Sequence, residues 1–451
     1  MDFALSQLQG NNHVEAIVMK KNAVLLGIAA LAVAYPAAAE SLVDWTNVPA
    51  TKMTLFYPGQ SSYQWLRSEA HQGAAKETAR GEACTSCHDD DTEEQRQGRK
   101  ILRGDHPLEP EIAAYKGKPG SVDVGVQAAY DDRNVYLRFQ WKGVHAGTEH
   151  PYLRFDGKEW KKYGDSVAQP SVMEGKQPAM YESRFSVMID DGKVPGFAEQ
   201  GCWMVCHSGM NDMPNQATKD EVAANALLQA IKQKDVRKYL PTTRTDALDW
   251  KSGKSVEEIA QQKAAGQFLD LFQWRGARSY TANMADDGYV LEYRYSDAGK
   301  NMWSGNQDSK TKLPKYMWDE SKVGYKAITK VDLRKREHGL DPARNAVPFD
   351  PNAGWNEGDL LPSNTVSRSH ASGSAADNNA IASYDNGVWT LVLIRPLGLT
   401  NPDDKPLKAG SVYNVGFAVH DGDSEGRAHY VSYVKTLGLG ADADIKAVKL
   451  Q

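Results

Sequence analysis

The chain has few cysteines and no strongly basic segment, and each shortage excludes a class of protein. Four cysteines in 451 residues are too few for a disulfide-held fold, and a chain of this length buries a hydrophobic core without them. Lysine and arginine number 53 against 58 aspartates and glutamates, which gives a net charge of −5 and leaves no block suited to a phosphate backbone. We therefore expect no nucleic-acid partner.

Long apolar runs are also scarce, with one exception near the N-terminus. The run Ala23–Ala39 follows two lysines and closes on three alanines. It is shorter than the about 20 residues that a membrane span needs, and this pattern is typical of a cleaved signal peptide; an uncleaved membrane anchor is the alternative. We interpret Met19 as the start and residues 1–39 as a gene-model extension plus signal peptide. The mature chain then begins near Glu40, is periplasmic and has no membrane span.

The first cysteine pair has the pattern of covalent haem attachment. In Cys84-Thr85-Ser86-Cys87-His88, a CxxCH motif, the two thiols add to the haem vinyl groups and the histidine binds the iron. A disulfide, a thioredoxin-like redox pair and half of a zinc site are the alternatives, but no βαβ pattern surrounds the motif. We predict that Cys84 and Cys87 carry a haem c and that His88 is its proximal ligand.

The second cysteine pair has one more residue between its thiols. Cys202-Trp203-Met204-Val205-Cys206-His207 is a CxxxCH motif, a rarer spacing that some c-type cytochromes use. Every cysteine of the chain lies in such a pair, and each pair ends in histidine. We therefore predict a second haem c on Cys202 and Cys206, with His207 as its proximal ligand. Iron is the expected metal, and the chain is predicted to be a dihaem c-type cytochrome.

Short alternating strands dominate the chain after residue 120. Alternating apolar residues over 121–130 are followed by a turn and a second strand over 135–141, and similar strands recur toward the C-terminus. The stretch 301–379 is typical of long loops. We predict a mainly β fold, in which an antiparallel β-sandwich haem-binding domain with helical and loop insertions spans 121–451. A small c-type cytochrome-like haem module at 40–120 precedes it.

Three stretches of the C-terminal part carry a family resemblance. They are 126–132 with the following strand, 387–397, and 417–422 leading into Val431-Ser432. In these stretches the chain resembles the haem-binding domain of the ethylbenzene dehydrogenase γ subunit and of related partners of dimethyl-sulfoxide-reductase-type molybdenum enzymes. The resemblance covers about Ser121 to the C-terminus. It implies a β-sandwich that binds haem between its sheets or at their open end and transfers electrons without turning over a substrate.

The same resemblance implies the axial ligands of the second haem. The b-type members of the family hold an unattached haem with a methionine and a lysine. His207 takes the place of that methionine, and His429 falls where the lysine stands, so we predict His207 and His429 as the axial pair. His429 also shares a strand face with Val431 and Tyr433. The alternatives are His420, His370, Met210 and Met213.

The distal ligand of the first haem is not fixed by the motif spacing. His71 is the first choice, and His106 is the second. The resemblance favours His71, because cytochrome-fused members of the family also carry a histidine in the tryptophan-rich stretch before the first haem motif. Here Trp65 precedes His71.

Two haems that each have two axial ligands leave no open iron site, so the sequence predicts one-electron transfer rather than catalysis. We expect a periplasmic respiratory cytochrome whose redox partners are a quinol-linked cytochrome or a molybdenum-type oxidoreductase. The alternative is a haem enzyme with an open iron site that acts on a small inorganic substrate. A carbohydrate-binding sandwich is a third possibility that rests on fold analogy alone.

Overall fold

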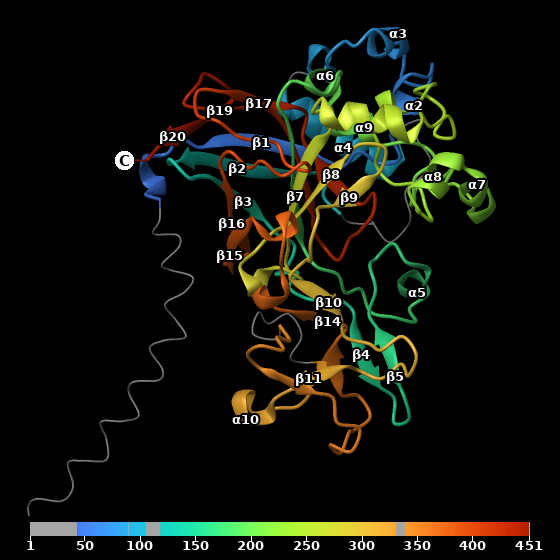
Figure 1. The fold of residues 1–451 in the computed structure, drawn as a ribbon, viewed down its shortest axis with the longest axis vertical. Helices are drawn as coiled ribbons and strands as arrows, with labels where there is room; N and C mark the ends of the chain where they lie inside the picture. The colour runs from blue at the N-terminus through green and yellow to red at the C-terminus, as the bar shows by residue number, and fades with distance from the viewer. Residues whose placement is uncertain (1–42, 89, 105–117, 331–338, 451) are drawn as a thin grey trace, which may run out of the picture. The chain divides into compact units, whose positions relative to one another are not determined.

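The computed structural model describes residues 43–88, 90–104, 118–330 and 339–450 (Figure 1). Residues Trp45–Gln451 cluster into one compact unit. The predicted signal peptide and His106 lie outside the described residues. Within the described part of the chain, no helix is both long and apolar enough to cross a membrane.

A single hydrogen-bonded sheet forms the body of the protein. Its strand order is β15-β16-β3-β2-β1-β18-β17-β6-β7-β8-β9, and β19 and β20 connect β17 back to β2. The strands β2-β1-β18-β17-β19-β20 therefore close into a six-stranded ring. The bounds are β1 Thr51–Phe56, β2 Ser121–Tyr130, β3 Asn134–Lys142, β6 Arg184–Asp190, β7 Leu269–Arg275, β8 Asp286–Val290, β9 Arg294–Ser296, β15 Asn379–Asp385, β16 Val388–Pro396, β17 Val412–His420, β18 His429–Val431, β19 Lys435–Leu439 and β20 Ile445–Lys449.

The mainly β fold is confirmed, and its pairing is antiparallel except where β20 joins β19 and β2. Local sequence explains the hairpins. Asn386 and Gly387 between β15 and β16 have φ values of 50° and 83°, and two successive positive φ values are what a two-residue hairpin turn requires. Between β2 and β3 the Asp131 carboxylate accepts hydrogen bonds from the backbone of Arg133 and Asn134, each at 2.7 Å.

The main hydrophobic core lies between two arms of this sheet. Phe139 of β3 packs against Phe185 of β6 with ring centroids 4.1 Å apart. Trp141 of β3 likewise contacts Trp274 of β7, with centroids 6.3 Å apart. The two arms also meet at their outer ends, where an isolated β-bridge joins Met284 to Asn379. The core is thus enclosed by strands from both halves of the chain.

The predicted haem module contributes a strand to this body. β1 pairs with β2 along its length and joins β18 through Phe56 and Val431. The helix α4 (Asp91–Arg103) packs on β1 and β2. It comes so close to the chain at Gly120 that a Cβ on Gly98 would lie 1.9 Å from the Gly120 carbonyl oxygen. Glycine at position 98 therefore permits the packing of this helix.

Short helices lie near the predicted haem motifs, and small sheets form the opposite end of the unit (Figure 1). The stretch 301–379 that was expected to be loops contains five of the short strands, β10–β14, and α10. The small sheets are β13-β4-β5, β10-β14 and β11-β12. Their bounds are β4 Tyr152–Phe155, β5 Trp160–Tyr163, β10 Trp303–Gly305, β11 Tyr316–Trp318, β12 Ala346–Pro348, β13 Leu360–Pro362 and β14 Asn364–Val366. The remaining α-helices are α2 Tyr63–Leu66, α3 Ala75–Ala79, α5 Pro170–Met173, α6 Phe197–Gln200, α7 Lys219–Ala224, α8 Ala226–Ala230, α9 Val256–Ala264 and α10 Glu320–Val323.

Candidate haem-binding sites

The first cysteine motif borders a cavity of about 410 Å³. Cys84, Cys87 and His88 all line it, together with His71. All four cysteines of the chain are free thiols in the structure. The rest of the wall includes large aromatic side chains, namely Trp65, Trp203, Phe56 and Tyr433. Both thiols, the predicted proximal histidine and its first-choice partner therefore face one space with apolar walls.

His71 and His88 are arranged as two axial ligands would be. Their rings are nearly parallel, with an interplanar angle of 12° and centroids 6.5 Å apart. Two metal–nitrogen bonds of about 2.0–2.1 Å, one on each face of an ion, place two imidazole rings at about this separation. The predicted pair thus fits a planar, six-coordinate iron group.

Local hydrogen bonds orient both histidines. His71 Nδ1 lies 3.0 Å from the Leu66 carbonyl oxygen, a contact that fixes the tautomer and leaves Nε2 for a metal. The backbone N–H of His88 donates to the Cys84 carbonyl at 3.0 Å, which closes a turn over the motif. His88 Nδ1 lies 3.8 Å from Glu93 Oε1 at the start of α4. A hydrogen bond at Nδ1 therefore orients the His71 ring, whereas Nδ1 of His88 has no hydrogen-bond partner among the described residues.

Burial disfavours the charged forms of Cys84 and His88. It raises the pKa of the Cys84 thiol to about 11, and it lowers the pKa of His88 below its ordinary value. A neutral imidazole is the form that binds a metal, so the pKa shift of His88 suits a ligand.

The second cysteine motif is fully buried beside another cavity, of about 440 Å³. Cys202 belongs to the 3₁₀ turn Gly201–Val205 and lines this cavity. β17 passes so close that a Cβ on Gly416 would lie 2.7 Å from the Cys202 Sγ. The other predicted ligands and alternatives on the wall are His429, His420 and Met210.

His429 is oriented in the same way as His71. Its Nδ1 lies 2.9 Å from the Gly426 carbonyl oxygen, which leaves Nε2 for a metal. His420 is its register partner on β17, and the two rings stack with centroids 4.9 Å apart. This separation is 1.6 Å smaller than that of His71 and His88 (6.5 − 4.9), so an iron does not fit between these two rings. His420 and His429 therefore stand on the same side of any bound group.

His207 is not on the wall of this cavity. Its Nε2 lies 2.9 Å from the Tyr239 carbonyl oxygen, and its Nδ1 lies 3.2 Å from the Gln64 amide nitrogen. Its ring stacks on Tyr239 with centroids 3.6 Å apart. In this arrangement the structure does not bring His207 and His429 together.

Three alternative ligands are placed differently from one another. Met210 lines the cavity, and its Sδ accepts the backbone N–H of His207 at 3.2 Å. Met213 is buried in a cluster with Met210 but is not among the cavity-lining residues. His370 is exposed on a 3₁₀ turn and lines neither cavity. Met210 is thus the methionine that borders the second site.

Arginines on the second cavity wall were missed by the sequence analysis. They are Arg184, Arg237, Arg275, Arg278, Arg294 and Arg427, and Lys238 joins them. A dense cationic lining suits a ligand that carries carboxylates, because guanidinium groups bind carboxylates in a bidentate manner. No sequence signal marks them, since they lie on separate strands and loops that come together only in the fold.

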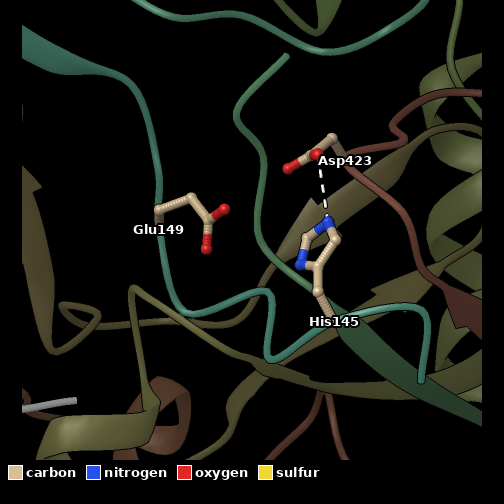
Figure 2. A group of neighbouring side chains, drawn as sticks. All are labelled: His145, Glu149 and Asp423. Carbon is tan, nitrogen blue, oxygen red and sulfur yellow. Dashed lines mark hydrogen bonds and ion pairs between the residues drawn. The ribbon is translucent and has the colours of Figure 1, made fainter. Parts of the chain in front are cut away.

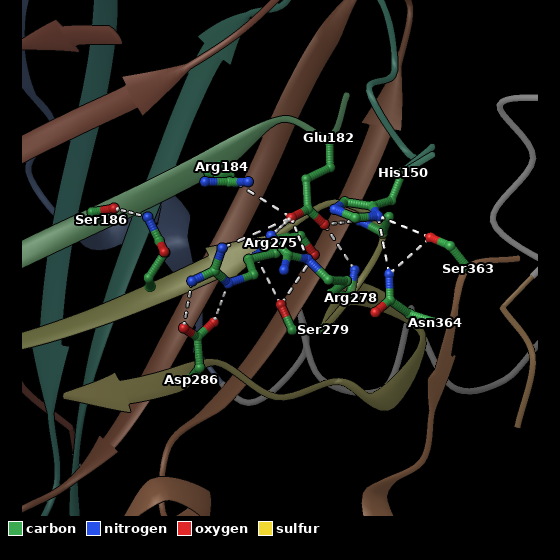
Figure 3. A network of polar contacts seen from close by, with 12 residues as sticks. His150, Glu182, Arg184, Ser186, Arg275, Arg278, Ser279, Asp286, Ser363 and Asn364 are labelled. Atoms are coloured by element: carbon green, nitrogen blue, oxygen red, sulfur yellow. Dashed lines mark hydrogen bonds and ion pairs between the residues drawn. The ribbon is translucent and has the colours of Figure 1, made fainter. Parts of the chain in front are cut away.

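One buried glutamate organises three of these arginines (Figure 3). Glu182 lies 2.7 Å from Arg278, 3.3 Å from Arg184 and 3.9 Å from Arg275. Burial opposes ionisation of Glu182, but the arginines outweigh it and hold its pKa well below the ordinary value. Arg275 also pairs with Asp286 at 2.8 Å. Buried carboxylates therefore hold Arg184, Arg275 and Arg278 in place on the cavity wall.

Two cations also contact the second attachment thiol. Cys206 Sγ lies 3.1 Å from Lys238 Nζ and 3.0 Å from Arg427 Nη1. Burial alone would raise the pKa of Cys206, but these cations lower it below the ordinary value. At Cys202, burial outweighs the effect of Lys238 and raises the pKa of the thiol to about 12. The two thiols of this motif thus differ in reactivity.

Aromatic rings connect the two sites. Trp203, which lies between Cys202 and Cys206, lines the first cavity. It stacks on Tyr433 with centroids 5.2 Å apart, and Tyr433 stacks on His88 with centroids 5.8 Å apart. The second motif therefore reaches the first histidine through two rings.

A third group of potential ligands is separate from both cavities (Figure 2). His145, Glu149 and Asp423 lie close enough to hold an ion, and none of them lines either cavity. His145 Nε2 lies 3.0 Å from Asp423 Oδ2, and Asp423 Oδ1 accepts the backbone N–H of Tyr181 at 2.9 Å. These contacts join the loop after β3 to the loop after β17, so the group has a structural explanation.

Comparisons with known proteins agree with these observations. The family described as ethylbenzene dehydrogenase matches residues 43–432. Cytochrome c-552 of Stutzerimonas stutzeri is 26% identical over 92% of this chain and 93% of its own length. Cytochrome c-551 of Rhodocyclus tenuis is 27% identical over 47% of this chain and 68% of its own length. A putative carbohydrate-binding protein from Bacteroides uniformis ATCC 8492 covers 77% of this chain and 84% of its own, but its TM-score of 0.21 at 8% identity supports no argument.

Proposed function

We propose that this chain, which belongs to the ethylbenzene dehydrogenase family, is a periplasmic c-type cytochrome that carries two covalent haems and transfers single electrons. The observation that carries the proposal is the pair of parallel imidazoles, His71 and His88, beside the thiols of Cys84 and Cys87. The similarity to two proteins that are themselves named cytochromes c supports it.

In the first site, Cys84 and Cys87 would attach the haem, and His88 and His71 would hold its iron. Trp65 and Tyr433 line the same cavity and would pack against the apolar surface of the porphyrin. Two histidine ligands would favour a low-spin iron that changes by one electron with little rearrangement.

In the second site, Cys202 and His429 line the arginine-lined cavity, and Cys206 lies behind Lys238 and Arg427 of its wall. Cys202 and Cys206 would attach the haem there, and His429 would hold its iron. The arginines bind the two propionates of the haem, whose carboxylates match guanidinium groups. His207, which follows Cys206, would be the second histidine to hold this haem, provided that its Nε2 were free of the Tyr239 carbonyl. Haem supplies the redox chemistry, and these residues set its position and potential.

The redox partners follow from the same assignment. Because both iron atoms are enclosed by protein ligands, electrons enter and leave through the haem edges to other proteins rather than to a bound substrate. We propose that these proteins are a quinol-linked cytochrome and a molybdenum-type oxidoreductase of a respiratory chain.

One observation favours a second candidate function. His207 is bonded to Tyr239 and Gln64 outside the second cavity, and a haem held by His429 alone would keep one iron position open. The cationic cavity wall would then admit a small inorganic anion to that position. This candidate is a haem enzyme that acts on such an anion.

The intact mass and the ferric spectra of the chain, matured with its haems, distinguish these functions. The proposal predicts two covalent haems, both low-spin by electron paramagnetic resonance, and no spectral change on addition of nitrite or cyanide. A single haem would overturn the assignment of Cys202 and Cys206. A high-spin haem that responds to nitrite would overturn the electron-transfer function in favour of the enzyme.

A further inference from the structure

Six aspartates gather at the outer ends of the two sheet arms, away from both cysteine motifs. Asp270 and Asp287 stand on β7 and β8, and Asp297 directly follows β9. Asp377 precedes β15, and Asp403 and Asp404 lie in the loop after β16. None of the six lines either haem-site cavity. This cluster, Asp270, Asp287, Asp297, Asp377, Asp403 and Asp404, is called the aspartate cluster below.

The carboxylates of the aspartate cluster converge and are buried. Ligand oxygens of Asp297, Asp403 and Asp404 lie within 4.8 Å of one another, and so do those of Asp270, Asp287 and Asp404. All five of these side chains are at most 5% exposed. The Asp404 carboxylate belongs to both groups and links them into one site.

Several of these oxygens have no hydrogen-bond partner among the described residues. Both carboxylate oxygens of Asp297 are buried without one, and so is Oδ1 of Asp270 and of Asp403. The neighbouring Asn378 amide oxygen is in the same state. A buried polar atom without a partner costs about 1–3 kcal/mol, so a native protein supplies a proton, a water or an ion there.

Positive charge from the protein is insufficient to balance the cluster. Arg395 pairs with Asp270 and lies 3.5 Å from Asp404. The backbone N–H of Lys405 donates to Asp270 at 2.9 Å, but its ammonium pairs with Asp191 at 2.5 Å. Asp403 accepts only neutral donors, the backbone of Ala298 and the Ser374 hydroxyl. No cationic side chain forms an ion pair with Asp297 or Asp403 among the described residues.

Without a cation the cluster would hold protons at neutral pH. Burial and the repulsion of the neighbouring carboxylates raise the pKa of Asp297 to about 9, and burial first of all raises that of Asp404 to about 7. A divalent ion offers the alternative, because it neutralises these carboxylates and satisfies their oxygens together.

We propose that the aspartate cluster is a structural calcium site, in which Asp297, Asp403 and Asp404 bind the ion directly. The chemistry of the donors selects the metal. Every potential ligand is an oxygen, whereas zinc prefers nitrogen and sulfur. Calcium takes six to eight oxygens in flexible geometry, which suits carboxylates from separate segments better than the strict octahedron of magnesium.

The ion would add a link between segments from the two arms of the sheet. The segments that supply the ligands follow β9 and β16, which belong to opposite arms of the sheet. The arms also meet here through the Met284–Asn379 bridge, the pair of Arg395 with Asp270 and the hydrogen bond from Ala298 N–H to Asp403. Calcium therefore closes the outer end of the body and raises its stability.

Calcium titration of the chelator-treated, haem-loaded full chain tests this proposal. We expect one calcium to bind per chain by isothermal titration calorimetry, with a higher Tm in calcium chloride than in magnesium chloride. Asp297→Asn weakens calcium binding at least about tenfold, because a charged ligand is lost. Asp156→Asn changes a partly exposed carboxylate in the β4–β5 turn, which pairs with Lys161 outside the aspartate cluster, and serves as the matched control with unchanged binding.

Two results would overturn the calcium site. One is the absence of stoichiometric calcium binding to the wild-type chain, a measurement that does not depend on whether a variant folds. The other is an Asp297→Asn chain that binds calcium as tightly as wild type while its haem spectrum is unchanged. Equal binding of magnesium and calcium would overturn the assignment of the metal.

Discussion

His71 and His88 face each other across the first cavity with parallel rings, although a helix and a loop separate them in the sequence. The Leu66 carbonyl holds one ring, and Glu93 at the start of α4 lies beside the other. The two rings are therefore already parallel in the polypeptide, and a haem bound at the proposed site would require little rearrangement of them. Preorganisation of this kind is what one-electron transfer requires.

Substitution of His71 tests the first axial pair. We expect His71→Ala to convert one of the two haems from low-spin to high-spin, because the sixth iron position loses its ligand. Electron paramagnetic resonance and the ferric absorption spectrum measure this change. His370→Ala, at an exposed histidine that lines neither cavity, is the control with an unchanged spectrum. If His106→Ala and not His71→Ala gives the high-spin haem, the assignment of His71 is wrong.

The opposite ligand of the second haem is identified by a pair of variants. With His207 as the ligand, His207→Ala produces a high-spin second haem, while Met210→Leu leaves the spectrum unchanged. Met210 is the sharper alternative because it lines the cavity. The sulfur-to-iron charge-transfer band in the near infrared reports methionine ligation directly. A band of this kind that disappears in Met210→Leu would assign the iron to Met210.

The arginine wall is expected to set the potential of the second haem. Arg294 lines the cavity, and its removal in Arg294→Gln takes away a charge that stabilises the reduced iron. The midpoint potential of one haem should fall by about 30–60 mV, since about 59 mV corresponds to a tenfold change for one electron. Spectroelectrochemical titration resolves the two haems. Arg294→Lys keeps the charge and should restore most of the potential, whereas equal shifts of both haems would contradict this location.

A buried glutamate on α4 predicts a pH-dependent stability. Burial is the main cause that raises the pKa of Glu94 to about 7, Asp90 and Asp91 add to it, and Lys435 opposes it. The folded chain therefore holds a proton that the unfolded chain releases near its ordinary pKa of 4.5, so the stability falls as pH rises from about 4.5 to about 7.

Replacement of Glu94 measures this effect. We expect Glu94→Gln to raise the free energy of unfolding by about 1–2 kcal/mol at pH 8 and to change little at pH 4.5, after allowance for partial solvation. Denaturant unfolding at the two pH values gives both numbers. Glu159→Gln, at an exposed position, should show no difference between them. An equal gain at both pH values would indicate a packing effect instead of titration.

Local patterns made part of this protein predictable. The alternation of apolar residues identified β2 and β3 nearly to their ends, and Asp385-Asn386-Gly387 marked the turn between β15 and β16. The family resemblance found in the C-terminal stretches is confirmed, and the family match extends back to residue 43, across the first cysteine motif. These features are local because a strand period, a turn or a motif is written in consecutive residues.

The remaining features depend on contacts between distant segments. Glu182 and Arg278 form one network only after β6 and β7 pair, and no motif connects them in the sequence. Asp297 and Asp403 converge because the two sheet arms meet. No sequence pattern predicts that approach. The position of His207 also escaped prediction, since its adjacency to Cys206 fixes its backbone and not the partner of its ring.

The pairing of β1 with β18 has a consequence for the order of folding. The strand that precedes the first cysteine motif completes its hydrogen bonds with a strand near the C-terminus, and β20 seals the ring against β2. Such long-range pairings form late, because the loop-closure entropy of nearly the whole chain must be overcome first. Both cysteine motifs precede β18 and β20 in the sequence, so they would be synthesised before the ring can close. If the haems were attached before the six-stranded ring closed, they would be present while the chain folds, rather than being added to the folded protein.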